Sequence, residues 1–200
     1  MRTSRWSFAA AFIFLAATIL PDSAAAQMPL HFVAGPNLGT ISSDEFDGAS
    51  TTVGFFAGVG TTFMLTETVG VSPYVAYVQK GAEFDSETAS YDYIEIPVLL
   101  VVGVPVGEGG TTFNIFGGPQ VGFQMNCDEG GFDCTEFDDH KGTEFGVLGG
   151  VGLGFPMGES GVLGVSVGAD LGLTDLYDTV SYKTRTYFLS LQYSVTVGGM

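Results

Sequence analysis

A strict alternation of apolar residues with small or polar ones runs through most of this 200-residue chain. It is clearest from Leu189 to Val197, where every odd-numbered residue is apolar and the residues between them are Ser, Gln, Ser and Thr. The stretch from Leu163 to Leu173 repeats the pattern, with glycine, serine and aspartate on its second face. An amphipathic helix would place apolar residues every three or four positions, so a period of two predicts β-strands.

Eight such segments follow one another, and the connections between them alternate in length. The segments LTET, VGEGG and PMGES predict tight turns, whereas the connections between those turns are longer and acidic. Short turns that alternate with long loops are typical of an antiparallel up-and-down β-barrel whose two ends face different environments. The fold class is therefore all-β, with strands expected at residues 30–41, 51–65, 69–80, 91–106, 111–125, 142–156, 160–174 and 184–197.

The composition of the two strand faces indicates which one meets lipid. The second face is mostly glycine, serine and threonine, and the whole chain contains only 6 lysines and arginines. A water-exposed wall would carry many charges, whereas small side chains suit the crowded interior of a narrow barrel. Aromatic residues near strand ends resemble the interfacial girdles of a membrane barrel; they are Phe63, Tyr77, Phe113, Phe123, Phe155 and Tyr187. This predicts a transmembrane barrel, with a soluble periplasmic ligand-binding barrel as an alternative.

Residues 1–26 have the pattern of a secretory signal peptide. Arg2 and Arg5 precede an apolar run, and Ala24–Ala26 form a small-residue cleavage site before Gln27. Residues 27–200 are then expected to form one barrel domain. The formal net charge of −16 disfavours nucleic acid as a partner.

Several blocks of the sequence resemble the outer-membrane β-barrel domain family, which includes PorT-like proteins and small barrels of the OmpA and OmpX type. These blocks are PNLGTI, YVAYVQKGAEF, YDYIEIPVLL, FNIFGGPQVGF and DLGLTDL. The resemblance implies an eight-stranded barrel in the outer membrane of a Gram-negative cell, with both termini in the periplasm. It implies little about activity.

The interior of an eight-stranded barrel is just wide enough for its own side chains. We expect it to be mostly filled, with inward glycines making room for large neighbours such as Phe56 and Tyr74. A few polar residues also lie at inward positions, and buried charges are costly unless they are paired. We therefore predict ion pairs near the loop-side mouth, such as Lys80 with Glu95; the candidates are Lys80, Glu95, Glu144, Asp170 and Arg185.

Cys127 and Cys134 enclose the segment CDEGGFDC in the longest loop. Six intervening residues exclude a C-x-x-C redox motif, and a zinc site would lack ligands. A disulfide that stiffens the loop is expected, and closing this loop restricts the unfolded chain by about 2.5 kcal/mol. Clustered acids in the same loop are weak candidates for cation binding, with simple solvation as the alternative; they are Asp128, Glu129, Asp133, Asp138 and Asp139.

These features favour a structural or surface-interaction protein of the outer membrane. A narrow channel, or a component of secretion or transport, is the alternative. The sequence offers no motif for catalysis, so we expect neither an enzyme nor a cofactor. The expected partners are outer-membrane lipid and lipopolysaccharide, the barrel-assembly machinery and divalent cations at the loops.

Overall fold

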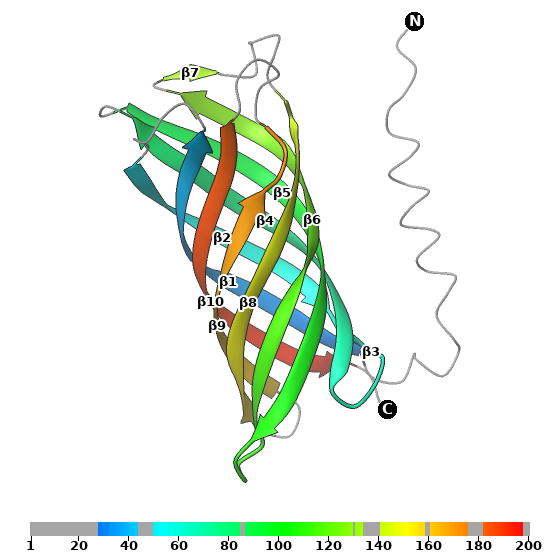
Figure 1. Ribbon diagram of the computed structural model, residues 1–200. Helices are drawn as coiled ribbons and strands as arrows, with labels where there is room; N and C mark the ends of the chain where they lie inside the picture. The colour runs from blue at the N-terminus through cyan, green and yellow to red at the C-terminus, as the bar shows by residue number, and fades with distance from the viewer. Residues whose placement is uncertain are drawn as a thin grey trace, which may run out of the picture.

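The computed structural model describes residues 28–43, 50–84, 87–129, 131–133, 141–158, 161–175 and 182–197. These residues form one elongated β-barrel (Figure 1). The predicted signal peptide, residues 1–26, lies outside the described residues and stays a prediction. In the part of the chain that the structure describes, no helix is both long and apolar enough to cross a membrane.

The wall of the barrel is a single antiparallel sheet that closes on itself. Neighbouring strands follow the order β2-β1-β10-β9-β8-β6-β5-β4-β3, and β2 also pairs with β4, which joins the two ends of the sheet. β2 and β3 belong to one wall segment interrupted at Thr62, and β7 pairs only with β6, so the described residues form an eight-stranded barrel. The strands are β1 (Met28–Ser43), β2 (Ser50–Thr61), β3 (Phe63–Met64), β4 (Val69–Phe84), β5 (Glu87–Val106), β6 (Thr111–Glu129), β7 (Phe132–Asp133), β8 (Thr143–Met157), β9 (Gly161–Gly172) and β10 (Tyr182–Val197).

All eight predicted wall strands are confirmed, and several continue farther than the alternation indicated. β4 extends to Phe84, β5 begins at Glu87, and β6 extends to Glu129 and then pairs with β7. These extensions contain glycine, aspartate and serine, which interrupt the apolar pattern. Backbone pairing needs no apolar side chain, so the ladder persists where the side-chain pattern stops.

The two ends of the barrel differ. The tight connection Gly107–Gly110 and the final residues of β10 lie at one end, called here the turn-side end, and β7 lies at the opposite, loop-side end (Figure 1). Gly107 and Gly110 both have φ of 73°, and Gly158 has φ of 69°. Only glycine adopts this left-handed region without steric cost, so the turn glycines allow these reversals.

The outer face of the wall is apolar. Val98, Leu100 and Val102 of β5 are exposed, as are Leu189 and Leu191 of β10. The residues between them point inward, so the predicted orientation is confirmed. A soluble ligand-binding barrel would have the opposite arrangement, with its apolar face inside.

The best-packed part of the interior lies in the loop-side half. Residues from β1, β4, β5 and β6 form one buried cluster, and Tyr93 and Ala82 have no exposed surface. The members of this apolar layer are Ile41, Ala82, Ala89, Tyr91, Tyr93 and Cys127. A narrow barrel therefore contains its hydrophobic core within its own lumen at this end.

Candidate functional site in the barrel interior

A buried cluster of charges lies on the turn side of the apolar layer. Lys80 Nζ lies 2.7 Å from Glu95 Oε1, 2.6 Å from Glu144 Oε1 and 2.7 Å from Asp170 Oδ2. These four side chains come from β4, β5, β8 and β9, and each is at most 4% exposed. Each occupies an inward position of its strand, so closing the sheet makes the four side chains converge. We call them the Lys80 cluster.

Two neutral side chains donate hydrogen bonds to Glu144 and Asp170 of the Lys80 cluster. Gln120 Nε2 on β6 donates to Asp170 Oδ1 at 2.8 Å and to Glu144 Oε1 at 3.4 Å. Thr184 Oγ1 on β10 donates to Glu144 Oε2 at 2.7 Å. Buried charges are tolerated when their remaining lone pairs are satisfied in this way. The cluster consequently ties together side chains from six wall strands.

The ammonium group of Lys80 fills the space in which a metal ion would otherwise fit. One carboxylate oxygen each from Glu95, Glu144 and Asp170 lies within 4.8 Å of the other two, a spacing that a cation could bridge. Lys80 carries three N–H donors, one for each of these carboxylates. The lysine therefore acts as the internal cation of the site.

Arg185 is absent from the Lys80 cluster, and its predicted inward position is wrong. Its side chain is exposed on the outer face of β10, together with Tyr187 and Leu189. The physical reason is the period of the strand, because residues two apart share a face. Arg185 lies near the loop-side end of β10, where a long side chain can extend toward the polar headgroup region.

The predicted disulfide lies only partly within the described residues. Cys127 is 2% exposed and belongs to the apolar layer, whereas Cys134 lies outside the described residues. The pairing of the two cysteines therefore stays a prediction. Its consequence would be to attach the longest loop to the packed end of the barrel.

The predicted cation candidates are only partly described as well. Asp128 is exposed, and its Oδ1 accepts a hydrogen bond from the Gly131 backbone N–H at 3.1 Å. Asp133 pairs with Asp128 through the β6–β7 ladder. The side chain of Glu129 is not described, and Asp138 and Asp139 lie outside the described residues. Cation binding at this loop stays a prediction.

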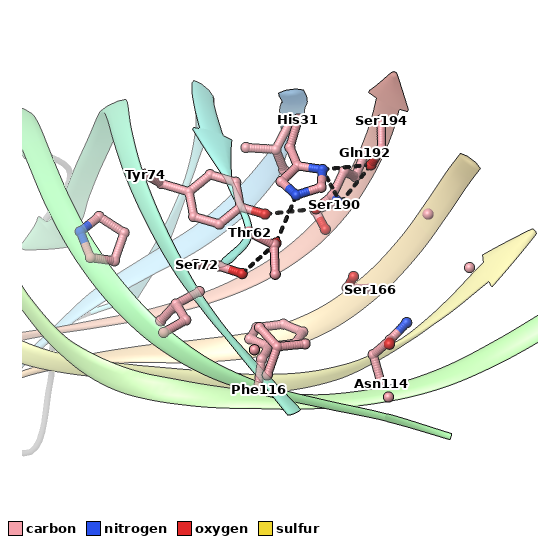
Figure 2. A pocket seen from close by; sticks show the side chains of 18 of the residues that line it. His31, Thr62, Ser72, Tyr74, Asn114, Phe116, Ser166, Ser190, Gln192 and Ser194 are labelled. Atoms are coloured by element: carbon pink, nitrogen blue, oxygen red, sulfur yellow. Dashed lines mark hydrogen bonds between the residues drawn. The ribbon is translucent and has the colours of Figure 1, made fainter. Parts of the chain in front are cut away.

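The turn-side half of the interior is hollow, contrary to the expectation of a mostly filled lumen. A cavity of about 470 Å³ extends from exposed residues at the turn-side end, including Glu67 and Thr196, to Glu95 and Asp170 of the Lys80 cluster. Its walls are mainly apolar, with inward residues such as Val78, Leu99 and Leu148; Figure 2 shows part of this lining.

Inward glycines explain why the cavity coexists with large rings. A side chain at Gly60 would overlap the ring of Tyr74, and one at Gly150 would overlap the end of Phe116. These glycines make room for rings, as the sequence led us to expect. Elsewhere, small residues such as Gly154 and Gly164 line the cavity and leave part of the lumen unoccupied.

A hydrogen-bonded chain of polar side chains lines one wall of the cavity (Figure 2). His31 Nδ1 lies 2.7 Å from Ser194 Oγ, and His31 Nε2 lies 2.7 Å from Thr62 Oγ1. Thr62 Oγ1 lies 2.6 Å from Ser72 Oγ. The His31 ring also stacks on Tyr74, with ring centroids 6.0 Å apart. We call these residues the His31 network.

The partners of His31 cannot be read from the alternation of its own strand. Ser194 is 163 positions away, and only the pairing of β1 with β10 brings the two together. A Ser–His pair can generate a nucleophile when a carboxylate orients the second imidazole nitrogen. In this network a threonine hydroxyl takes that place, so the geometry favours a structural role for His31.

Comparisons with known proteins agree with this fold. Residues 23–178 match the model of a family described as outer membrane protein beta-barrel domain. No curated protein sequence matches the chain significantly. The narrower resemblance to PorT-like proteins stays a prediction.

Solved structures of outer-membrane barrels are similar in shape. Neisserial surface protein A (NspA) aligns with a TM-score of 0.58 at 12% identity, covering 83% of this chain and 96% of that chain. Ail, the attachment invasion locus protein of Yersinia pestis, gives 0.45 at 15% identity, covering 83% and 97%. The outer membrane enzyme PagL gives 0.44 at 15% identity, covering 80% and 97%. At such low identity, the NspA likeness shows the fold alone.

Proposed function

The chain belongs to the outer membrane protein β-barrel domain family, and we propose that it is a non-conducting barrel that acts at the cell surface through its acidic loop-side end. The Lys80 cluster carries this proposal. It crosses the lumen between β4, β5, β8 and β9, and its side chains are at most 4% exposed. The apolar layer adds a second obstruction on its loop side.

With the lumen closed, the barrel would contact partners at the cell surface through its loop-side end. Its sequence is acidic, and Asp128 is exposed there at the end of β6. Carboxylates and phosphates are both hard oxygen ligands for divalent cations. We therefore propose that the loops bind Mg²⁺ or Ca²⁺ shared with the phosphate groups of neighbouring lipopolysaccharide. This role needs no catalysis.

A loop-side variant and a turn-side control variant test the surface role. Asp128→Asn, Asp138→Asn and Asp139→Asn remove three loop-side charges, and Glu67→Gln with Glu108→Gln removes turn-side charges as the control. Calorimetric titration of Mg²⁺ into nanodiscs containing lipopolysaccharide should show weaker binding for the loop-side variant than for wild type. The turn-side variant should bind as wild type does. Equal binding by all three proteins contradicts the proposal.

A narrow channel is the second candidate, because one observation favours it. The cavity reaches Glu95 and Asp170, so the Lys80 cluster and the apolar layer are what separate it from the loop-side end. Planar-bilayer recordings distinguish the two functions. A non-conducting barrel gives no current steps. Current steps from the wild-type protein, with a larger amplitude in Tyr93→Ala, would establish a channel that is gated at the apolar layer.

A further inference from the structure

The hollow half of the lumen has the properties of a binding site, independently of any role at the surface. We propose that the cavity binds a slender, uncharged amphiphile, a molecule with one apolar chain and a single hydrogen-bond donor at its end, such as a long-chain alcohol. Its volume of about 470 Å³ lies within the range of small-molecule pockets. Mainly apolar cavities are poorly hydrated and bind apolar molecules in preference to water.

The length of the cavity suits a ligand with an extended apolar chain. β1 lines it from Pro29 near the turn-side end to Asn37 at the deep end. At about 3.3 Å per residue and a strand tilt of about 40°, this corresponds to a depth of roughly 20 Å. A cavity of this volume and depth is narrow, so it favours a single unbranched chain over a ring system.

Two unpartnered polar atoms mark the deep end of the cavity. Asn37 and Thr186 lie on the neighbouring strands β1 and β10, line the cavity and are each 2% exposed. Asn37 Nδ2 donates to the Gln79 carbonyl oxygen at 3.0 Å, but Asn37 Oδ1 and Thr186 Oγ1 have no hydrogen-bond partner among the described residues. Buried polar atoms of this kind are costly unless something satisfies them. A hydroxyl group at the end of a bound chain would donate to Asn37 Oδ1 and pair with Thr186 Oγ1.

The charge at the deep end selects against an anionic head group. Glu95 and Asp170 line the cavity, and the Lys80 cluster contains three carboxylates but one ammonium group. A further carboxylate, such as the head group of a fatty acid, would meet this excess of acidic groups at close range in a low-dielectric environment. The same apolar chain should therefore bind as an alcohol and not as a carboxylate.

Methyl-resolved NMR of the full barrel in nanodiscs can test the site. Leu99 and Leu148 line the cavity, whereas Leu100 and Leu189 face outward and report partitioning into the bilayer. Decanol should shift the Leu99 and Leu148 methyl signals to saturation, while the Leu100 and Leu189 signals change linearly. Decanoate at neutral pH should give only the linear change. Absence of saturable shifts at the cavity methyls, or equal saturation by decanoate, overturns the proposal.

Two variants test where the apolar chain of the bound alcohol and its head group lie. Thr186→Val removes a hydroxyl that has no partner, so the barrel should keep its fold while decanol binds about fivefold more weakly. Ser166→Phe fills the cavity and should abolish the saturable shifts. A shift in gel mobility on boiling verifies that each variant is a folded barrel. Unchanged decanol affinity in folded Thr186→Val contradicts the assigned position of the head group, and unchanged affinity in folded Ser166→Phe contradicts binding in the cavity.

Discussion

The two halves of the lumen are built from the same strands, but one is packed and the other is hollow. In the loop-side half, Tyr91 and Tyr93 fill the space on the loop side of the Lys80 cluster. In the turn-side half, the same barrel surrounds a cavity of about 470 Å³. The number of strands determines the width of a barrel, so the difference between the halves comes from the volume of the inward side chains.

β5 and β9 illustrate how this volume is distributed. β5 places Tyr91, Tyr93 and Glu95 inward at the loop-side end, whereas β9 places Gly164 and Ser166 inward toward the turn-side end. The outer face of β5 exposes apolar side chains from Ile96 to Val106, and that of β9 exposes Val167 and Leu171. The contact with lipid therefore constrains one face of each strand, and the other face is available for a core or a cavity.

Removing the ammonium group of Lys80 should cause the largest loss in the free energy of unfolding. Lys80→Met leaves three buried carboxylates without their ammonium partner, and breaking a buried pair in this way costs about 3–5 kcal/mol. Urea unfolding of the barrel in detergent micelles should show this loss of free energy. A variant that also contains Glu95→Gln, Glu144→Gln and Asp170→Asn removes the uncompensated charges and should recover part of the loss. Equal stability of Lys80→Met and wild type would contradict the role assigned to the cluster.

The same substitution in each half measures the contrast in packing directly. Tyr93 has no exposed surface in the apolar layer, whereas Tyr74 lines the cavity and donates from its hydroxyl group to Gln192 Oε1 at 3.2 Å. Tyr93→Ala should lower the free energy of unfolding by about 3–5 kcal/mol, since it opens a new cavity. Tyr74→Ala should cost about 1–2 kcal/mol, because it enlarges an existing one. Similar losses in both variants would show that the turn-side half is as well packed as the loop-side half.

A pair of glycine substitutions should give smaller effects than Tyr93→Ala, and the smallest is expected at Gly164. A Cβ atom at Gly146 would lie 2.7 Å from the Leu171 carbonyl oxygen and 2.8 Å from Gln120 Nε2, which donates to Asp170, so Gly146→Ala should destabilise the barrel by about 1–3 kcal/mol. At Gly164 the nearest atom would be Gln192 Cβ at 3.3 Å, and Gly164→Ala should change stability by less than about 0.5 kcal/mol. Thermal unfolding followed by circular dichroism compares the two. A larger loss for Gly164→Ala would reverse the assignment of packed and hollow halves.

Contacts of the interior could be predicted from the sequence where the two residues lie on neighbouring strands of one hairpin. Lys80 and Glu95 occupy adjacent strands of the β4–β5 hairpin, so the alternation alone places both side chains inward and near one another. Glu144 and Asp170 come from the opposite wall, and their convergence on the same ammonium depends on the closure and stagger of the sheet. Gln120 and Thr184 were missed because neutral polar residues at inward positions carry no distinctive signal. Arg185 shares the parity of Tyr187, so the period of two by itself puts its side chain on the outer face, against our prediction.

The sequence by itself determined the strands, their antiparallel order and the apolar outer face, because each depends on the period of two and on the length of the connections. Only the tertiary structure decided that β1 meets β10, that His31 meets Ser194, and that four charged residues converge in one lumen. It also decided which half of the interior is hollow. Inward side chains from all eight wall strands share one enclosed space, so whether they fill it depends on their combined volume and stagger, which no single strand contains.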